Sequence, residues 1–321
     1  MTTLTMRPYR GEADLDAIAH LINTCDAVDQ LDQGTSITEL QQEFNTPSLD
    51  QARDLKLWED TEGKLIGFGQ LWIPPLGEVS NNFFRFFAHP RVRGGDLEKQ
   101  IVAWGEGRMR EVKQEHGVQQ LKLQSPTRAD QSQRIALLER CGFTPDRYFF
   151  TMERSLSLPI SEPQLPEGFT IRQIEGEKDT QAWVEMYNQT FIDHWGHYDF
   201  TVELANHYLR DPHYRPELDL IAVAPDGTFA GFCYCHINPE DNQRNQRNEG
   251  WITGLGTRRG FRKLGIGRAM LLTGIQRLKA AGVDRAKLGV DSQNPSSAGR
   301  LYESVGFHQV HTHIWFVKDV L

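Results

Sequence analysis

The chain has 321 residues, of which 39% are hydrophobic and 24% charged, and its formal net charge is -8. This length favours two domains, and this composition is typical of a globular protein rather than a disordered chain. The chain has no apolar run of ~18 residues and no charged-then-apolar N-terminal pattern, and its four cysteines lack metal-ligand or disulfide spacing, so we expect a cytoplasmic protein with no membrane contact and no metal.

The predicted elements occur in the same order twice along the chain. In each half a strand and helices precede a hairpin with a glycine-containing turn, and a further strand, a helix, another strand, a short helix and closing strands follow. The predicted strands include 55–58, 65–72, 83–88 and 148–153 in the first half, and 218–223, 229–237, 251–257, 286–290 and 313–318 in the second, where the long helix covers 269–281. This order predicts a mixed α/β fold with two tandem domains, each a mostly antiparallel mixed sheet flanked by helices.

Sequence similarity between the halves supports a duplication. Residues 63–68 (GKLIGF) recur as 227–232 (GTFAGF), and residues 138–143 (LERCGF) recur as 302–307 (YESVGF), in both cases 164 positions later. A repeat at fixed spacing indicates two copies of one domain. Three prolines between 159 and 166 interrupt helix and strand. We therefore place a first domain at 1–156, a linker at 157–167 and a second domain at 168–321.

The most informative motif is Arg-x-x-Gly-x-Gly at residues 262–267, between the strand that ends at Thr257 and the long helix. Glycine lets backbone approach a ligand, and a helix N-terminus offers free N–H groups and a positive dipole end, which suits a pyrophosphate. Arg258, Arg259 and Arg268 crowd the same turn. Basic residues confined to one turn of an acidic chain indicate a local anionic ligand rather than a nucleic acid.

A second motif follows one strand later, with Asn294, Ala298, Leu301-Tyr302 and Gly306-Phe307. Together the two motifs resemble those of the GCN5-related N-acetyltransferase (GNAT) family, whose pyrophosphate loop reads Arg/Gln-x-x-Gly-x-Gly/Ala. The resemblance implies a GNAT-like domain in each half and acetyl-CoA as co-substrate. It also implies transfer of an acetyl group to a primary amine of a small molecule or a peptide.

The same resemblance implies roles for individual residues. Backbone amides of the loop would bind the CoA pyrophosphate, and the strand ending at Thr257 would diverge from the next strand so that pantetheine can pair with it. Tyr302 matches a tyrosine near the CoA sulfur, where a phenol can protonate the leaving thiolate; a packed aromatic is the alternative. Asn294 would bond the cofactor or fix its turn. The implied cofactor-binding residues are Leu255, Thr257, Arg262, Lys263, Leu264, Gly265, Ile266, Gly267, Arg268 and Asn294.

The general base and the acceptor site are open at this stage. Glu249 begins the strand that leads to Thr257 and would share its facing if no bulge intervened, which makes it the predicted base; His236, His311 and His313 are alternatives. The aromatic and histidine cluster at 191–198 is either a cleft wall or ordinary packing. The polar segment 238–248 is interpreted as a solvated extension of a hairpin.

The first half departs from the motif at the positions that matter. Asp96 and Glu98 stand where the loop of the second half has glycines, and Leu138 stands where it has Tyr302. Carboxylates at that place would repel a pyrophosphate and obstruct the backbone. We therefore expect no catalysis and no cofactor in the first half, which would be a structural partner or a wall of an acceptor cleft.

Two other functions stay open. The tandem layout resembles the two-domain members of the family that acetylate the free cysteinyl amine of a sugar-linked thiol. The alternative of another class is a non-catalytic acyl-CoA sensor or scaffold, which would keep the loop and lose the acid; Tyr302 beside the loop favours an enzyme. The sequence identifies neither the amine acceptor nor the oligomeric state, monomer or dimer.

Overall fold

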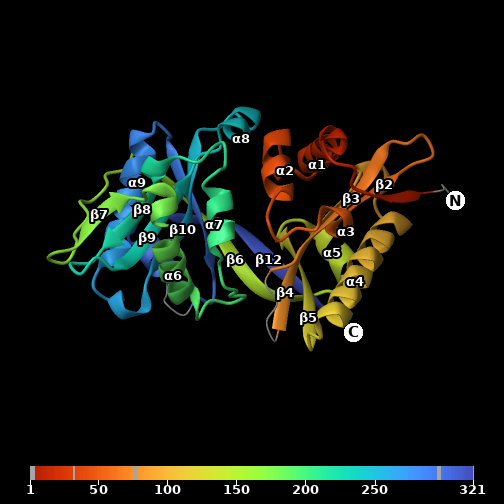
Figure 1. The fold of residues 1–321 in the computed structure, drawn as a ribbon. Coiled ribbons are helices and arrows are strands. Elements are labelled where there is room, and N and C mark those ends of the chain that lie inside the picture. Colours follow the sequence, from red (N-terminus) through yellow and green to blue (C-terminus); the bar gives the residue numbers. More distant parts are fainter. Residues whose placement is uncertain (1–3, 32, 75–78, 295–297, 321) are drawn as a thin grey trace. The chain divides into compact units, whose positions relative to one another are not determined.

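The computed structural model of the protein describes residues 4–31, 33–74, 79–294 and 298–320. The chain forms two compact units, of which unit 1 comprises Met1–Arg147 and Ile314–Leu321 and unit 2 comprises Tyr148–His313 (Figure 1). Two long strands, β6 (Thr144–Ser155) and β12 (His308–Asp319), run from one unit into the other. Each unit therefore takes a closing strand from the other half of the sequence, so its limits differ from those of the sequence repeat.

Unit 1 contains a five-stranded run in the order β1-β2-β3-β4-β5, in which only β4 and β5 are parallel, followed by the end of β12. Its elements are β1 (Thr5–Pro8), α1 (Leu15–Asp29), α2 (Ile37–Phe44), α3 (Gln51–Asp54), β2 (Leu55–Glu59), β3 (Leu65–Trp72), β4 (Val79–Ala88), α4 (Asp96–His116), β5 (Gln120–Arg128) and α5 (Ser132–Arg140).

Helices cover both faces of this sheet. Successive residues of a strand point to opposite faces, so neighbouring residues of β3 contact different helices. Gly69 of β3 makes room for α4, since a Cβ there would lie 2.7 Å from a ring carbon of Trp104. Its neighbour Phe68 points the other way, and its ring lies 5.9 Å from that of Phe44 in α2. Helix α4 thus lies on one face, while α1 and α2 share an apolar cluster with Phe68 on the other.

Unit 2 repeats this order, with the strands β6-β11-β10-β9-β8-β7 and a parallel pair only at β10 and β11. Its elements are β7 (Thr170–Gln173), α6 (Thr180–Phe191), α7 (Val202–Tyr208), β8 (Asp219–Val223), β9 (Phe229–His236), α8 (Pro239–Arg244), β10 (Glu249–Thr257), α9 (Ile266–Ala280), β11 (Arg285–Asp291) and α10 (Ala298–Glu303). The expected mixed α/β fold in two tandem parts is confirmed.

The two faces of the second sheet are covered in the same way. A Cβ on Gly274 of α9 would lie 2.5 Å from the Sγ of Cys233. The adjacent residue Phe232 faces the opposite side, where its ring lies 5.5 Å from that of Trp183 in α6. Helix α9 and helix α6 therefore lie on opposite faces of β9.

The duplication is visible in a repeated ion pair. Arg7 of β1 binds both carboxylate oxygens of Asp14, each at 2.8 Å, and Asp14 also accepts the N–H of Arg10. Arg172 of β7 binds both oxygens of Asp179, at 2.5 and 3.0 Å, with the matching N–H supplied by the residue at position 175. In both units the first strand is thereby fastened to the start of the first helix.

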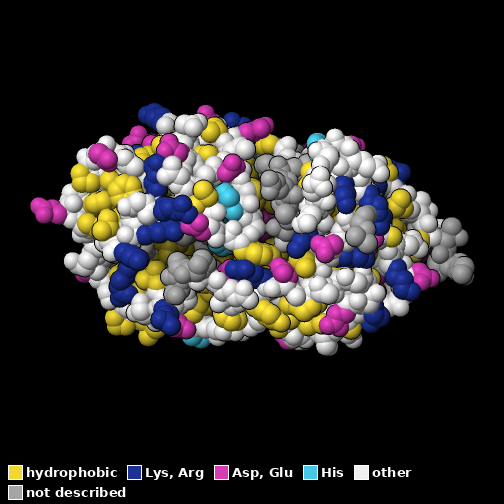
Figure 2. Space-filling model, turned by 90° about the horizontal axis from the view of Figure 1, so that it is seen from below, with side chains coloured by type: hydrophobic (Ala, Val, Ile, Leu, Met, Phe, Trp, Pro, Cys, Tyr) yellow, Lys and Arg dark blue, Asp and Glu magenta, His cyan; other side chains and the backbone are white. Residues whose placement is uncertain are grey.

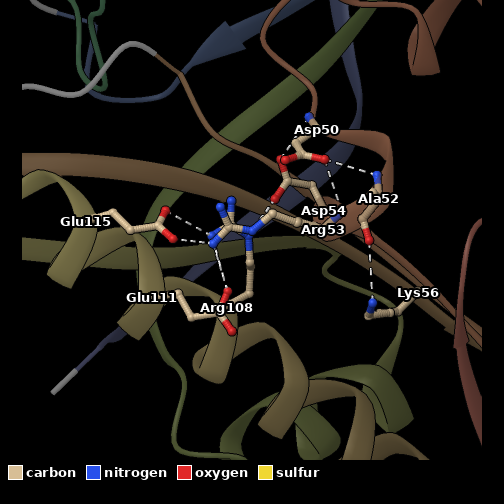
Figure 3. A network of polar contacts seen from close by, with 8 residues as sticks. All are labelled: Asp50, Ala52, Arg53, Asp54, Lys56, Arg108, Glu111 and Glu115. Atoms are coloured by element: carbon tan, nitrogen blue, oxygen red, sulfur yellow. Dashed lines mark hydrogen bonds and ion pairs between the residues drawn. The ribbon is translucent and has the colours of Figure 1, made fainter.

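A buried polar network distinguishes unit 1 from unit 2. Asp54, at the end of α3, is 2% exposed and accepts a hydrogen bond of 2.8 Å from the Nε of Arg108 in α4. Figure 3 shows Glu111 and Glu115 of α4 turned toward Arg53 and Arg108 in the same network. Burial raises the pKa of Asp54, although Arg108 opposes that effect. The residue 164 positions later in unit 2 is the buried Leu218, so the network is particular to unit 1.

The polar segment between β9 and β10 contains a helix. Segment 238–248 contains α8, with Pro239 at its first position and the side chain of Asn238 accepting the N–H of Asp241 at 2.9 Å. These are helix-start signals, so the segment that joins the antiparallel strands β9 and β10 contains a short helix that the interpretation as a hairpin extension did not include. Among the residues described, no helix is both long and apolar enough to cross a membrane.

Candidate active site in unit 2

Strand β10 has an unpaired edge near its C-terminal end. Its parallel pairing with β11 extends only to Ile252, whereas its antiparallel pairing with β9 continues to Thr257. The N–H of Arg258 donates to the carbonyl of Ala230 at 2.9 Å. Since alternate residues of an antiparallel strand bond to the partner strand, the backbone groups of Leu255 and Thr257 point away from β9. The two residues expected to pair with pantetheine therefore turn their backbone groups toward the β11 side, beyond the end of the β10–β11 pairing, and the carbonyl of Thr257 accepts a hydrogen bond of 3.4 Å from the Nε of Arg262.

A bulge in β10 decides which side chains face which helix. The register with β9 shifts between Ile252 and Gly254. In a regular strand, residues three positions apart point to opposite faces of the sheet. Ile252 nevertheless belongs to the apolar cluster that includes residues of α9, and Leu255 packs against the same cluster. Glu249 and Thr257 consequently lie on opposite faces of the sheet, and the shared facing expected for an unbroken strand does not occur.

The turn between β10 and α9 has a backbone that glycine permits. Gly265, directly before α9, has a φ of +86°, a region in which a Cβ is strained. A Cβ on Gly267 would lie 3.2 Å from the Oγ1 of Thr257, so a longer side chain would crowd the strand end. Lys263 has a φ of +66°, and Leu264 is 50% exposed, while Ile266 is buried and anchors the first turn of the helix. The loop is thus open to solvent and shaped to bring its N–H groups to an anion.

Arg262 has a structural role that the motif did not reveal. Its guanidinium donates to the carbonyl of Thr190 at 2.8 Å and pairs with Asp193 at 3.4 Å, both at the end of the first helix of unit 2. Arg93 holds the matching position in unit 1, where it pairs with Asp29 at 2.6 Å. Because the arginine keeps such partners in the unit whose loop lacks the two glycines, it fastens the loop to the helix in both units.

Other basic side chains of the loop also have protein partners. Arg258 pairs with Glu185 at 2.6 Å, and Arg268 donates to the hydroxyl of Ser304 at 2.6 Å. Figure 2 shows lysine and arginine side chains close together on the surface that unit 2 forms. Positive charge beside a helix N-terminus favours an anionic ligand even when individual guanidinium groups are paired.

Tyr302 lies in α10 and is 8% exposed. It belongs to the cluster that contains Cys233 and Ile266, against which Leu255 also packs, and its ring lies 6.2 Å from that of Phe307. Burial raises the pKa of Tyr302 to about 12. The phenol therefore stays protonated at neutral pH, as a proton donor must, and it lies in the same cluster as Ile266 at the end of the glycine loop.

Glu249 sits in a different environment. Its carboxylate is 2% exposed, and its Oε2 lies 2.6 Å from the Nζ of Lys287. Its Oε1 accepts the indole N–H of Trp251 at 3.2 Å and lies 3.3 Å from the Nε of Arg247. A buried carboxylate with such partners is a typical structural ion pair. Tyr302 and Leu255 thus belong to one apolar cluster, whereas Glu249 lies at the other end of β10.

The other predicted site residues, Asn294 and His313, lie in different elements of the fold. The backbone N–H of Asn294 donates to the carbonyl of Asp291 at 3.1 Å in the turn after β11, and residues 295–297 of the motif lie outside the described residues. The Nε2 of His313 lies 3.2 Å from the hydroxyl of Thr151. Among the described residues no group of three or more histidine, cysteine, aspartate or glutamate side chains could hold a metal ion.

The loop of unit 1 is occupied by its own carboxylate. Glu98 is 6% exposed, and its Oε2 accepts the N–H of Gly94 at 2.7 Å. Lys318 pairs with Glu106 beside it and donates to the carbonyl of Cys141 at 2.6 Å. An internal anion therefore bonds a backbone group that the loop of unit 2 leaves exposed.

Comparison with known proteins agrees with this geometry. A sequence model of the Acetyltransferase (GNAT) family matches residues 180–307. Over 265 residues the chain is 30% identical to the mycothiol acetyltransferase of Kineococcus radiotolerans, which covers 80% of this chain and 79% of that protein. The chain belongs to the GNAT acetyltransferase family.

The likeness to GNAT proteins extends over nearly the whole chain. The mycothiol acetyltransferase of Thermobispora bispora is 29% identical over 297 residues, which is 92% of each chain. The crystal structure of a GCN5-related N-acetyltransferase from Sphaerobacter thermophilus superposes with a TM-score of 0.75 at 26% identity, covering 99% of this chain and 96% of that one. Both units of this acetyltransferase therefore have counterparts in relatives of similar length.

This GNAT protein also has a cavity on the α6 side of the second sheet. The cavity has a volume of about 440 Å³ and is lined by α6, α7, the segment after α7 and strands β8 to β10. Phe191 and Tyr198 of the aromatic segment contribute to its wall, and His236 lies on its lining, as do Asp219 and Thr253. Asp219 was missed because a single aspartate at a strand start resembles a turn residue. The repeat carried a usable signal, since the position 164 residues earlier is Leu55.

Proposed function

We propose that the protein is an acetyl-CoA-dependent N-acetyltransferase that acetylates a primary amine of a small molecule. One observation carries this proposal: unit 2 combines the end of β10 beyond its pairing with β11, the open loop at Gly265, and the buried, protonated Tyr302. In unit 1, Glu98 bonds the loop backbone and Leu138 replaces the tyrosine. The catalytic domain is therefore the second one, and unit 1 is its structural partner.

The residues of unit 2 fit acetyl-CoA as a co-substrate. Loop N–H groups between Arg262 and Gly267 would hold the pyrophosphate, with Arg268 and the start of α9 adding positive potential. The backbone of Leu255 and Thr257 would pair with the pantetheine amides, and Asn294 would fix the turn beside them. Gly265→Asp would remove both the permitted backbone and the electrostatic fit.

The reaction requires one bond to form and one to break. The thioester supplies an activated acetyl group, so the amine nitrogen forms a bond to the acetyl carbon while the carbon–sulfur bond breaks. Tyr302 would donate its phenolic proton to the departing thiolate, and the ammonium of the acceptor would lose a proton to a base. The acceptor leaves as an amide and the donor leaves as a thiol.

Glu249 remains the predicted base, and its surroundings make a sharp test possible. It faces the α6 side of the sheet, the side on which the cavity lies, but Lys287 and Trp251 hold its carboxylate. If Glu249 is the base, Glu249→Gln lowers kcat about 100-fold while the Kd for acetyl-CoA is unchanged. If the variant loses stability but keeps kcat, the residue is an ion-pair partner only.

The relatives named mycothiol acetyltransferase favour a second acceptor, the amine of a cysteinyl group. That candidate predicts that a cysteinyl amide is acetylated in preference to an alanyl amide of the same size. Equal rates with both would remove it. A non-catalytic acyl-CoA sensor would bind acetyl-CoA and release no free CoA thiol with any amine.

Calorimetric titration with acetyl-CoA tests the proposal. We expect one site per chain in the wild-type protein and none in Gly265→Asp. Gly282→Asp is the matched control, because Gly282 has a comparable φ of +90° at the other end of α9, so it brings similar strain without touching the loop. Two sites would show that unit 1 also binds the donor. Absence of binding to the wild-type protein would overturn the proposal.

A further inference from the structure

The cavity of unit 2 contains an aspartate whose position needs an explanation. Asp219 is 5% exposed, and its Oδ2 accepts the hydroxyl of Tyr214 at 3.1 Å. Its Oδ1 is buried and has no hydrogen-bond partner among the described residues. Burial raises the pKa of Asp219 to about 7. An acceptor oxygen kept in the wall of a cavity without a donor indicates a ligand that supplies one.

The surroundings of Asp219 favour a cation. The lining includes a second carboxylate, Asp211, and no lysine or arginine among the described residues that form it. The rings of Tyr214 and Tyr234 stack with centroids 6.3 Å apart, and Trp183 and Phe232 also line the cavity. Aromatic faces attract cations, and a carboxylate among them supplies the opposite charge.

The strand register fixes where this carboxylate lies relative to β10. Asp219 of β8 is paired with Tyr234 of β9, which is paired with Gly254 of β10. Paired residues share a face of the sheet, and neighbouring strands are about 4.8 Å apart, so Asp219 lies two strand spacings, roughly 10 Å, from β10. Thr253 and Gly254 line the same cavity, so it extends from Asp219 to the strand that carries Leu255.

The matching strand positions of unit 1 hold other residue types. Leu55 stands in place of Asp219 and Gln70 in place of Tyr234, and both are buried. The amide of Gln70 donates to Glu43 of α2 at 2.7 Å. The carboxylate therefore belongs to the unit with the open glycine loop and is not required by the shared fold.

We propose that this cavity binds the acceptor of the reaction, and that Asp219 Oδ1 binds a second cationic amine of that acceptor while its first amine reaches the acetyl group beside β10. This inference rests on the proposed function and names its substrate class, an aliphatic amine that carries a second ammonium group across an apolar spacer. Asp219 is a binding residue for the distant end of the acceptor. Tyr214 positions it by donating to Oδ2.

Rates with paired probes test this inference. Straight-chain diamines of three to eight carbons are compared with the monoamines of the same length, with release of CoA thiol from acetyl-CoA as the readout. We expect kcat/KM for the best diamine to exceed that of its monoamine at least 10-fold. Asp219→Asn should remove this preference by raising KM for the diamine more than KM for the monoamine of the same length. Asp284→Asn, which changes a side chain that is 67% exposed, is the matched control and should preserve the preference.

Calorimetry of the same diamines with the CoA-saturated protein separates this inference from the proposed function. Equal use of diamines and monoamines, or an equal loss of both in Asp219→Asn, would overturn the inference while leaving acetyl transfer intact. If no probe is acetylated, diamine binding that disappears in Asp219→Asn supports it, and no diamine binding overturns it. Failure of acetyl-CoA itself to bind would instead count against the proposed function.

Discussion

Units 1 and 2 share the contacts that fasten their first strand and their loop to the first helix, and they differ in the residues at the candidate binding positions. Both fasten the first strand to the first helix through an arginine–aspartate pair, Arg7–Asp14 and Arg172–Asp179. Both also fasten the loop after the fourth strand to the end of that helix through an arginine, Arg262 in unit 2. These contacts stabilise the fold irrespective of any ligand, so they persist in a unit that lacks the glycine loop.

The differences lie at the positions where a donor and an acceptor would bind. Unit 2 has Gly267 at the start of its long helix, Tyr302 in its short helix and Asp219 in the cavity wall. Unit 1 has Glu98, Leu138 and Leu55 at these places, of which Glu98 bonds the loop itself. A motif arginine can therefore persist for structural reasons, whereas the glycines, the tyrosine and the buried aspartate distinguish unit 2, which we propose to be the catalytic unit.

The largest expected effect comes from removing the phenol that unit 1 lacks. Tyr302→Phe should lower kcat by about 10²–10⁴-fold if Tyr302 is the general acid, while the Kd for acetyl-CoA stays within a factor of two. Since burial raises the pKa of Tyr302 to about 12, the acid form persists through pH 10, and kcat of the wild-type enzyme should not fall there by loss of this proton. Tyr148→Phe, at a tyrosine that is 41% exposed, serves as control. An unchanged kcat in Tyr302→Phe would reduce Tyr302 to a packed aromatic.

The buried aspartate of unit 2 should make stability depend on pH. The pKa of Asp219 is about 7 in the fold, against an ordinary value of about 3.9 in the unfolded chain, so the fold favours the protonated form. The corresponding stability is fully present below pH 4 and is lost as the pH rises through 7. Asp219→Asn cannot ionise, so it should gain up to about 4 kcal/mol on the wild-type protein between pH 4 and pH 8.

Urea denaturation across that pH range measures this gain. A difference that stays constant with pH would show that Asp219 does not titrate in the window. A less stable Asp219→Asn at pH 8 would show that the ionised carboxylate has partners in the fold. Either result would weaken the contrast between Asp219 and the apolar Leu55 of unit 1.

Sequence patterns predicted the order of strands and helices well, and they predicted the candidate site in part. Hairpin alternation and the 164-residue repeat located β2 with β3 and β8 with β9, and the glycine spacing located the loop before α9. Local patterns could not predict the bulge after Ile252, because it depends on pairing with β9, and that bulge turns Glu249 to the other face. The repeat shows that Asp219 stands where unit 1 has Leu55, but only its pairing with Tyr234 and the cavity beside them show what surrounds it. The exchange of closing strands likewise depends on contacts between distant residues.

The smallest effect is expected in unit 1, at its buried ion pair. Asp54→Asn removes the buried carboxylate that bonds Arg108 and leaves it only the exposed Glu111 and Glu115, which should lower the free energy of unfolding by up to about 3 kcal/mol. Unit 2 indicates how to compensate, because an apolar Leu218 stands at the matching position. The double variant Asp54→Leu with Arg108→Met removes both charges and should recover most of that loss, and acetyl-CoA binding should be the same in all three proteins. A double variant no more stable than Asp54→Asn would mean that the network with Glu111 and Glu115, rather than the buried pair, holds α3 against α4.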